Sequence, residues 1–539
     1  MQYNDNTERR SRRKRRRNGP VLILFGVLAL AAVAVLGITI PAILDDGSGK
    51  TAAEDKQPAE ERSVDAQELA AVELAPEAAG TVAQPEAPAT EAGILPAGAS
   101  PEEALARVGG SGCVLADEST ILLRMNLGGQ PATGDAELNV YQLAPYQYEL
   151  SEGEIVGTAA VSDSPEARFP RAPHDSVDSL YCKYVFATKE GEMLGEPQYI
   201  VNPELLATST KEREGYQPKG LADIFYNYNL DTEEGGDHLI LQINNYGSNP
   251  TLRHPAGNGT DPYPVDEGPF QYMFNAANAE GVNALAASMH NLADTHITQD
   301  YIVGNEVNER KWCYVNYMDW DRYVREYLQG FRVSYNAIKS ANANAHVFIC
   351  LSQDWDRNRT PGEPEYYAYI DAKDFVLKFN AMIKAAGDVD WGLSYHPHPV
   401  PLTHARFWDM TGMDPIYSIM INTNAMVSFQ NLSVLTDFMM APELLSPTGR
   451  VRHMMASETG LSAGQGEEVQ AAALYASYQA CIRNPYIETM IYSPDPSINA
   501  VFLAKTQEVY DNMGGPADPE YDAWAKSVIG IDDWSRVLR

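Results

Sequence analysis

The stretch Tyr301–Arg310, which reads YIVGNEVNER, decides how the second half of this 539-residue chain is interpreted. Three apolar residues run into Gly304, and a cluster of polar side chains follows at once: Asn305, Glu306, Asn308 and Glu309. A short apolar run bounded by turn signals is typical of a strand buried on both faces, as in a parallel sheet. In barrels of parallel strands, functional side chains lie at the carboxyl ends of the strands. The stretch therefore predicts a site at the end of a buried strand.

Strand-like and helix-like segments alternate from residue 204 to residue 539, as in consecutive βα units. Strands are predicted at 238–244, 301–304, 345–351, 390–395, 452–457 and 488–492, with a weaker one at 222–228. Amphipathic helices are predicted at 319–340, 372–386, 432–445 and 467–483. The expected fold class is α/β, a (β/α)8 TIM-like barrel whose N-terminal half is degenerate. Residues 247–275, rich in Gly, Pro and Asn, predict a long loop that is functional or disordered.

Residues 111–203 have a different texture, with short alternating runs separated by turn residues. Examples are 121–126, 136–141, 180–186 and 198–201. This pattern predicts a small immunoglobulin-like β-sandwich that packs against or spaces the barrel, with sugar binding as the alternative role.

The N-terminal region, residues 1–110, divides into three parts. Residues 1–19 form a basic tail, residues 20–44 an apolar segment long enough to cross a bilayer, and residues 45–110 an Ala-, Pro- and Glu-rich stalk expected to be disordered. Basic residues on the N-terminal side of an apolar segment place that end in the cytoplasm. We expect a single-pass signal anchor with the barrel outside the cell; a cleaved signal peptide is the alternative.

Charge is unevenly distributed along the chain. The net charge is −33, although residues 1–17 hold eight Lys/Arg against two acids, a net of +6, which leaves about −39 for the rest. So acidic a body argues against nucleic acid as a partner.

The five cysteines show no CxxC spacing, so buried free thiols are expected, and one Cys113–Cys182 disulfide remains the alternative.

A second glutamate at a predicted strand end supplies a partner for Glu306. It is Glu458, which follows the strand-like run 451–457, and the segment YHPHP (395–399) ends the strand between them. The three segments GNEVNE (304–309), DWGLSYHPHPVPL (390–402) and VRHMMASETG (451–460) resemble clan A of the glycoside hydrolases. More closely, they resemble an uncharacterised bacterial family of clan-A-like TIM-barrel proteins, over residues 215–500.

The resemblance implies a role for each matching residue. Glu306 is expected to be the general acid/base, Asn305 a ligand of the sugar 2-hydroxyl and Glu458 the nucleophile of a retaining glycosidase. Retaining enzymes place the two carboxyl groups about 5–5.5 Å apart. Asn308 is also expected to bind substrate, and Glu309 is a competing acid that more plausibly caps the following loop. The reaction implied needs no cofactor.

Other residues near the predicted strand ends complete the expected site. Tyr395 is expected to hydrogen-bond Glu458, and His396 and His398 to line the sugar subsite. The His-x-His pattern also raises a metal site with His404, which we do not expect because no acidic partner lies nearby in sequence.

Two aromatic residues are possible sugar platforms. Trp355 offers a ring face for a sugar, although packing on a neighbour is an equal alternative. Tyr492 stands where members of clan A often place a tryptophan.

The sequence therefore predicts an extracellular, membrane-anchored glycoside hydrolase-like protein acting on a poly- or oligosaccharide. The missing tryptophan and the thin N-terminal half of the barrel support a second hypothesis, a non-catalytic protein that binds glycan in the same place. A structural spacer is a third. A barrel by itself implies no chemistry, so the substrate class rests on the resemblance.

Overall fold

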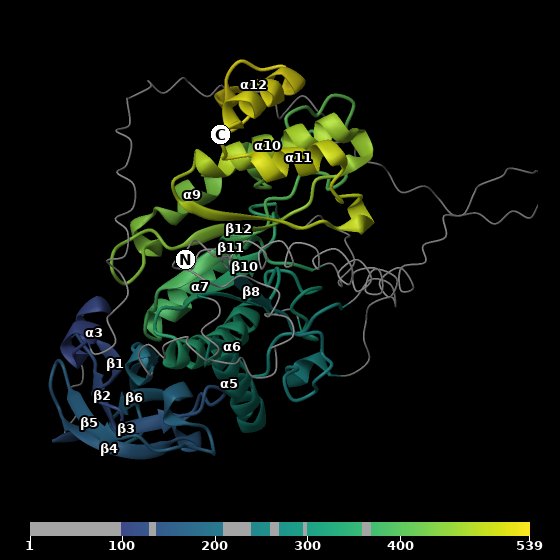
Figure 1. The fold of residues 1–539 in the computed structure, drawn as a ribbon. Coiled ribbons are helices and arrows are strands. Elements are labelled where there is room, and N and C mark those ends of the chain that lie inside the picture. The colour runs from purple at the N-terminus through teal and green to yellow at the C-terminus, as the bar shows by residue number, and fades with distance from the viewer. Residues whose placement is uncertain are drawn as a thin grey trace, which may run out of the picture. The chain divides into compact units, whose positions relative to one another are not determined.

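Six parallel strands form the central sheet of the computed structural model (Figure 1). The structure describes residues 99–128, 136–207, 239–258, 269–294, 299–317, 319–357 and 368–539, all within one compact unit, 86–539. The strands lie side by side in chain order: β8 (Ile240–Ile243), β9 (Asp300–Val303), β10 (His346–Leu351), β11 (Trp391–Tyr395), β12 (Met454–Thr459) and β13 (Ile487–Tyr492). All neighbouring pairs are parallel, so their carboxyl ends share one edge.

Helices alternate with these strands and follow the last of them. They are α5 (Ala279–Asp294), α6 (Trp320–Ala341), α7 (Ala372–Ala385), α8 (Pro415–Asn422), α9 (Ser433–Met439), α10 (Glu467–Ile482), α11 (Ala504–Asn512) and α12 (Asp518–Ile529), with α3 (Pro101–Arg107) earlier in the chain. Helix α5 packs on α6, and α10 packs on both α11 and α12 (Figure 1). Helix α6 begins where the Asp319 carboxylate accepts hydrogen bonds from two backbone N–H groups of its first turn.

The six strong strand predictions are confirmed, with bounds within two residues. Sequential parallel order is the arrangement found in (β/α) barrels, and the described strands form such a sheet of six. The eight-stranded closure stays a prediction, and the weaker strand at 222–228 lies outside the described residues.

One helix prediction needs correction, and α5, α8, α11 and α12 were not predicted from the sequence. The helix expected at 432–445 ends at Met439, because Pro442 lacks a backbone N–H and disfavours helical geometry just before it. The buried face of α5 combines Val282, Leu285 and Met289, which lie at helical spacing, with small residues, so an apolar periodicity was present in the sequence.

Two antiparallel sheets precede the barrel strands. One contains β1 (Gly112–Leu115), β2 (Thr120–Arg124) and β5 (Glu166–Pro170); the other contains β4 (Glu154–Ala160), β3 (Glu137–Leu143), β6 (Lys183–Ala187) and β7 (Met193–Tyr199). The rings of Phe169 and Tyr184 meet between the sheets at 5.3 Å. The two packed sheets agree with the predicted sandwich, and its immunoglobulin-like topology stays a prediction.

Buried polar side chains of α6 hold the sandwich against the barrel. Arg332 donates hydrogen bonds to the carbonyls of Gly387 and Ile200, at 3.0 and 2.9 Å. Asn336 donates to the carbonyls of Leu180 and Ile200. A fully buried guanidinium with carbonyl acceptors on both elements fixes their contact.

All five cysteines are buried free thiols, as expected, and Cys113 and Cys182 are not bridged. The predicted basic tail, signal anchor and most of the stalk lie outside the described residues. Among the residues that the structure does describe, we find no helix with the length and apolarity needed to span a bilayer.

Candidate active site

Glu306 lies just beyond the end of β9 in a strained backbone conformation. The turn begins at Gly304, whose φ of 90° is open to glycine, and Glu306 itself has a φ of 38°. A non-glycine residue in the left-handed region is uncommon and costs roughly 1–3 kcal/mol. Backbone hydrogen bonds hold the turn: Gly304 donates to Ile243 at 2.9 Å and Val307 donates to Cys350 at 2.8 Å. The neighbouring strands therefore fix where the Glu306 carboxylate points.

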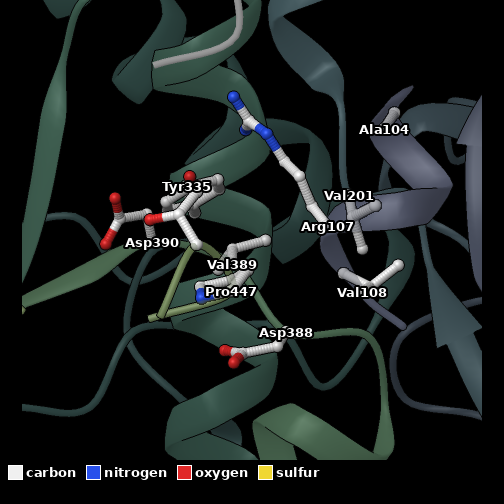
Figure 2. Close-up of a pocket in the computed structure, with 10 residues that line it drawn as sticks. Ala104, Arg107, Val108, Val201, Tyr335, Asp388, Val389, Asp390 and Pro447 are labelled. Carbon is white, nitrogen blue, oxygen red and sulfur yellow. The ribbon is translucent and has the colours of Figure 1, made fainter. Parts of the chain in front are cut away.

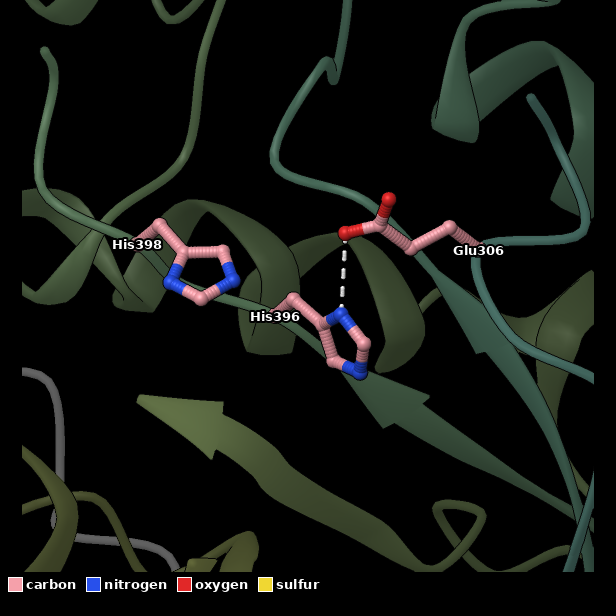
Figure 3. A group of neighbouring side chains, drawn as sticks. All are labelled: Glu306, His396 and His398. Atoms are coloured by element: carbon pink, nitrogen blue, oxygen red, sulfur yellow. Dashed lines mark hydrogen bonds and ion pairs between the residues drawn. The ribbon is translucent and has the colours of Figure 1, made fainter. Parts of the chain in front are cut away.

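His396 lies between the two predicted catalytic glutamates. Its Nδ1 is 2.9 Å from Oε1 of Glu306, a contact drawn in Figure 3. The same nitrogen lies 3.7 Å from Oε2 of Glu458. On the other side of the ring, Nε2 lies 3.2 Å from the Cys350 sulfur. The imidazole is fully buried, so these three neighbours define its surroundings.

The separation of the two carboxylates is limited by this shared neighbour. Because Glu306 Oε1 and Glu458 Oε2 lie 2.9 and 3.7 Å from His396 Nδ1, the distance between these two oxygens cannot exceed the sum of the two contacts. The side chain of Glu306 is 12% exposed and that of Glu458 is 34% exposed. Both acids of the predicted pair therefore lie beside His396, and their catalytic roles stay a prediction.

The electrostatics of the group centre on His396. Burial disfavours its charged ring, but Cys350 and Glu306 raise the pKa of His396 well above its usual value. Burial alone would raise the pKa of Glu306, but the His396 hydrogen bond and charge bring that pKa below its usual value. Burial raises the pKa of Glu458; the His396 charge works against this, and the Glu306 charge adds to it. At rest, the proton of this group therefore lies on the imidazole.

His398 completes the cluster from the same strand end. Its backbone N–H donates to the His396 carbonyl at 2.9 Å, and its Nε2 lies 3.7 Å from Oε1 of Glu458. Glu306, His396 and His398 each offer one ligand atom within 4.8 Å of the others (Figure 3). Burial and the neighbouring His396 charge lower the pKa of His398 to about 4, so its ring is neutral at pH 7.

Two more acids lie close to Glu306. Burial raises the pKa of Glu309 well above its usual value, and the charges of Glu306 and Asp354 add to this. Burial also raises the pKa of Asp354 to about 6, against the effect of Arg357 at 3.3 Å. The carbonyl of Glu309 accepts hydrogen bonds from the next turn, as expected for a residue that caps this loop.

Three sequence-predicted ligands have structural roles instead. Asn308 is fully buried; its amide nitrogen donates to Ser352 and Ile370, and its oxygen accepts from the Ser352 backbone. Trp355 is buried in the core, edge-on to the rings of Tyr395 and Phe438, so it is not an exposed sugar platform. The hydroxyl of Tyr395 faces the Val427 carbonyl at 3.5 Å and not Glu458.

Two further residues also lie elsewhere. The Tyr492 hydroxyl donates to the Ala500 carbonyl at 2.7 Å, and its ring packs on Phe502 at 4.2 Å. Both nitrogens of His404 have other partners, the Asp409 carbonyl and the Gln465 side chain, each at 2.8 Å. His404 is therefore separate from the His396 and His398 pair.

Sequence reasoning missed several residues that support the site. Gln242 on β8 donates to Oδ1 of Asn305 at 2.6 Å and so orients the side chain next to Glu306. Cys350 faces His396, and a hydrogen bond between Ser394 and Ser457 joins β11 to β12 beneath it. These contacts follow from strand order and register, which a linear sequence does not display.

A hollow away from Glu306 lies where α3 meets the loops that lead into β11 and β12 (Figure 2). Its volume is about 20 Å³, room for one water molecule. An adjoining open hollow measures about 310 Å³. Asp388, which lines both, is bound by Arg452 at 3.0 Å through both of its oxygens. With that acid paired, the region lacks the two facing carboxylates of the site at Glu306.

Comparisons with known proteins agree with this picture in outline. A family of unknown function (DUF5722) matches residues 237–500, which include all six parallel strands, Glu306 and Glu458. This agrees with the uncharacterised family that the motifs resemble. No curated protein matches the chain.

Solved glycoside hydrolases are among the structures similar to this chain. A family 39 glycoside hydrolase from Bacteroides cellulosilyticus WH2 aligns at 15% identity over 75% of this chain and 79% of its own, with a TM-score of 0.28. The β-glucosidase of Pyrococcus furiosus aligns at 13% identity over 48% and 62%, with a TM-score of 0.27. Xylanase 10B of Clostridium thermocellum, complexed with xylohexaose, aligns at 13% identity over 79% and 96%, with a TM-score of 0.31.

These likenesses are loose. The chain spans 62% of the length of the β-glucosidase, and 50% of a Salmonella typhimurium structure assigned as an α-amylase. With TM-scores below 0.5 they carry no argument about the chemistry of this chain. That argument rests on the side chains at the strand ends.

Proposed function

We propose that the protein is a retaining glycoside hydrolase that cleaves a poly- or oligosaccharide with Glu306 and Glu458. The observation that carries the proposal is the pair of carboxylates on either side of His396, with oxygens 2.9 and 3.7 Å from the same ring nitrogen. A retaining mechanism needs a separation of about 5–5.5 Å, whereas an inverting one needs about 6.5–9.5 Å. The two oxygens would reach the lower end of the inverting range only if the nitrogen lay on a straight line between them. Any bend at the nitrogen shortens the distance between these two oxygens, so the contacts are compatible with the spacing that retention needs.

In the first step, the Glu458 carboxylate attacks the anomeric carbon and forms a glycosyl ester. The glycosidic C–O bond breaks, and its oxygen takes a proton from Glu306. In the second step, Glu306 accepts a proton from water, the resulting hydroxide attacks the anomeric carbon, and Glu458 leaves as a carboxylate. No cofactor takes part.

His396 supplies the proton that the general acid needs. In the resting protein the imidazolium donates its Nδ1–H to Glu306, which leaves that carboxylate ionised. Bound substrate excludes water, and a less polar environment favours the neutral pair, in which the proton has moved along the 2.9 Å bond to Glu306. His396 is thus a positioning and proton-holding residue, and Glu306 the group that touches substrate.

A panel of aryl glycosides and glycans tests the activity. We expect Glu306→Gln and Glu458→Gln to lower hydrolysis roughly 10²- to 10⁴-fold, while Glu443→Gln, an exposed acid beyond α9, changes it little. A 2-deoxy-2-fluoro glycoside matched to the best substrate should label Glu458, identified by peptide mass spectrometry. Label on Glu306 would reverse the two roles, and no hydrolysis of any substrate would end the proposal.

Non-catalytic glycan binding on the same surface is the second candidate function. The near burial of Glu306, with 12% of its side chain exposed, favours binding over catalysis. Binding of a glycan that survives Glu458→Gln, without hydrolysis by the wild type, would support this candidate.

We further propose that the protein works outside the cell on an N-terminal anchor; protease protection of intact cells tests that location.

A further inference from the structure

Three potential metal ligands, Glu306, His396 and His398, converge at the ends of β9 and β11, and Glu458 on β12 lies beside them. Besides the 2.9 Å contact of Glu306 with His396, Glu458 brings its oxygens to 3.7 Å from Nδ1 of His396 and from Nε2 of His398. The absence of an acidic partner near the His-x-His pattern argued against a metal in the sequence. The fold removes this objection, since it places two carboxylates beside the two imidazoles.

His398 provides a second, independent observation. Its side chain is 9% exposed, and among the described residues neither ring nitrogen has a hydrogen-bond partner: Nδ1 is unpaired and Nε2 stands 3.7 Å from the nearest carboxylate oxygen. Buried polar groups without partners are rare and cost about 1–3 kcal/mol each, so each needs an explanation. The buried atom without a partner is Nδ1; Nε2, the nitrogen that faces Glu458, has no hydrogen bond to the described residues and is open to a cation.

We propose that Glu306, His396, His398 and Glu458 bind one divalent transition-metal cation of the zinc class. Two imidazole nitrogens and two carboxylates suit Zn²⁺ and its neighbours better than Mg²⁺ or Ca²⁺, which prefer oxygen ligands. With bonds of about 2.0–2.1 Å, neighbouring ligand atoms of a tetrahedral site stand roughly 3.3 Å apart. The contacts of 2.9 and 3.7 Å lie near that value, and Glu306, His396 and His398 offer ligand atoms within 4.8 Å of one another.

Cys350 is placed to orient one ligand. Its sulfur lies 3.2 Å from Nε2 of His396, so Nε2–H can donate to sulfur while Nδ1 faces the cluster. Metal-bound histidines characteristically use the second ring nitrogen in this way, which fixes the tautomer and the ring.

A bound cation and the proton that His396 passes to Glu306 exclude each other, because both occupy the Nδ1 lone pair of His396. Cation binding stands without the proposed function. Its consequence, that Zn²⁺ inhibits hydrolysis and a chelator restores it, rests on that function. A direct binding measurement without substrate keeps the two proposals separate.

The test is a titration of the purified, untagged, full-length protein with Zn²⁺ by isothermal calorimetry, after treatment with a chelator. We expect one site per chain in the wild type, and a loss of roughly 10- to 100-fold in affinity in His398→Ala. Glu458→Gln, which is isosteric and partly exposed, should weaken binding comparably and serves if His398→Ala fails to fold.

His404→Ala is the matched control, since His404 is a buried histidine of the same segment whose nitrogens are bound by Asp409 and Gln465. Affinity in this variant should equal that of the wild type. No zinc binding by the wild type, unchanged binding by His398→Ala, or equal weakening by His404→Ala would each overturn the proposal. None of these outcomes would contradict the proposed hydrolysis, which is measured separately in the presence of a chelator.

Discussion

Replacement of Glu326 tests how the loops around the site are held. Glu326 lies on α6, and its carboxylate is shared by the loops that leave β8 and β9. His254 Nε2 of the first loop lies 3.1 Å away, the Tyr317 hydroxyl of the second loop donates to it, and Arg322 Nε donates at 2.9 Å. Glu326→Gln keeps the size of the side chain and removes its charge, so the change isolates the electrostatic part of this clamp.

The magnitude follows from the pKa of Glu326. Burial alone would raise that pKa, but His254, Tyr317 and Arg322 lower it from 4.5 to about 2. A difference of about 2.5 in pKa, at 1.36 kcal/mol for each whole unit, corresponds to about 3 kcal/mol of folding free energy at pH 7. The side chain is 12% exposed, so solvent screening removes only a small part of this.

The sign of the pH dependence is fixed by the direction of the shift. Because the folded pKa lies below the unfolded one, the stabilisation is fully present above pH 4.5 and is lost as the pH falls through about 2. Glu326→Gln should therefore cost about 2–3 kcal/mol at pH 7, and the difference from wild type should shrink steadily below pH 4.5.

Urea denaturation followed by circular dichroism at pH 7, 4 and 3 measures this difference. Glu520→Gln, an exposed acid on α12, controls for the simple loss of one negative charge. A Glu326→Gln variant as stable as wild type at pH 7, to within the roughly 0.5 kcal/mol typical of neutral surface changes, would refute the reasoning about Glu326. A difference that grows as the pH falls would refute it equally.

Three more predictions concern the strand ends. Gly304→Ala should cost about 1–3 kcal/mol in thermal unfolding, because φ is 90° and the new Cβ would lie 2.6 Å from a methyl of Val307; an unchanged melting temperature would contradict it. Asn308→Ala should lower the free energy of unfolding by about 1–3 kcal/mol, because the buried Ser352 backbone N–H loses its acceptor. Urea denaturation measures this loss. Trp355→Phe should lower the free energy of unfolding by roughly 1–3 kcal/mol and leave glycan binding, measured by calorimetry, unchanged. Weaker binding at unchanged stability would instead support the hypothesis that Trp355 stacks against a sugar.

Much of the parallel sheet could be predicted because its strands are buried on both faces. Such strands appear as uninterrupted apolar runs, and β9 and β11 are buried at every position. Helix α5 was missed although Val282, Leu285 and Met289 lie at helical spacing on its buried face, and α9 ends early because Pro442 follows it.

The acidic pair and the two histidines could also be predicted, since each lies at or just beyond the carboxyl end of a strand and parallel strands share an edge. Their mutual arrangement could not. Parallel pairing of β10 with β11 aligns Cys350 with Ser394, which brings the sulfur to His396, and pairing of β8 with β9 brings Gln242 to Asn305. Register of this kind depends on contacts between residues far apart in the chain.

Hydrogen-bond satisfaction separates the two kinds of polar residue at these strand ends. Asn308 has each amide atom engaged by the protein and therefore stabilises the loop, although its position in the sequence is as favourable for a ligand as that of Glu306. His398 and Glu458 lie at the same edge with unused capacity, and Glu306 holds a strained backbone to reach them. Strain and unmet polar groups cost stability, so a fold keeps them together where a ligand or a reaction uses them. On this ground the Glu306, His396, His398 and Glu458 cluster, and not the better satisfied residues around it, is where substitution should change binding or chemistry.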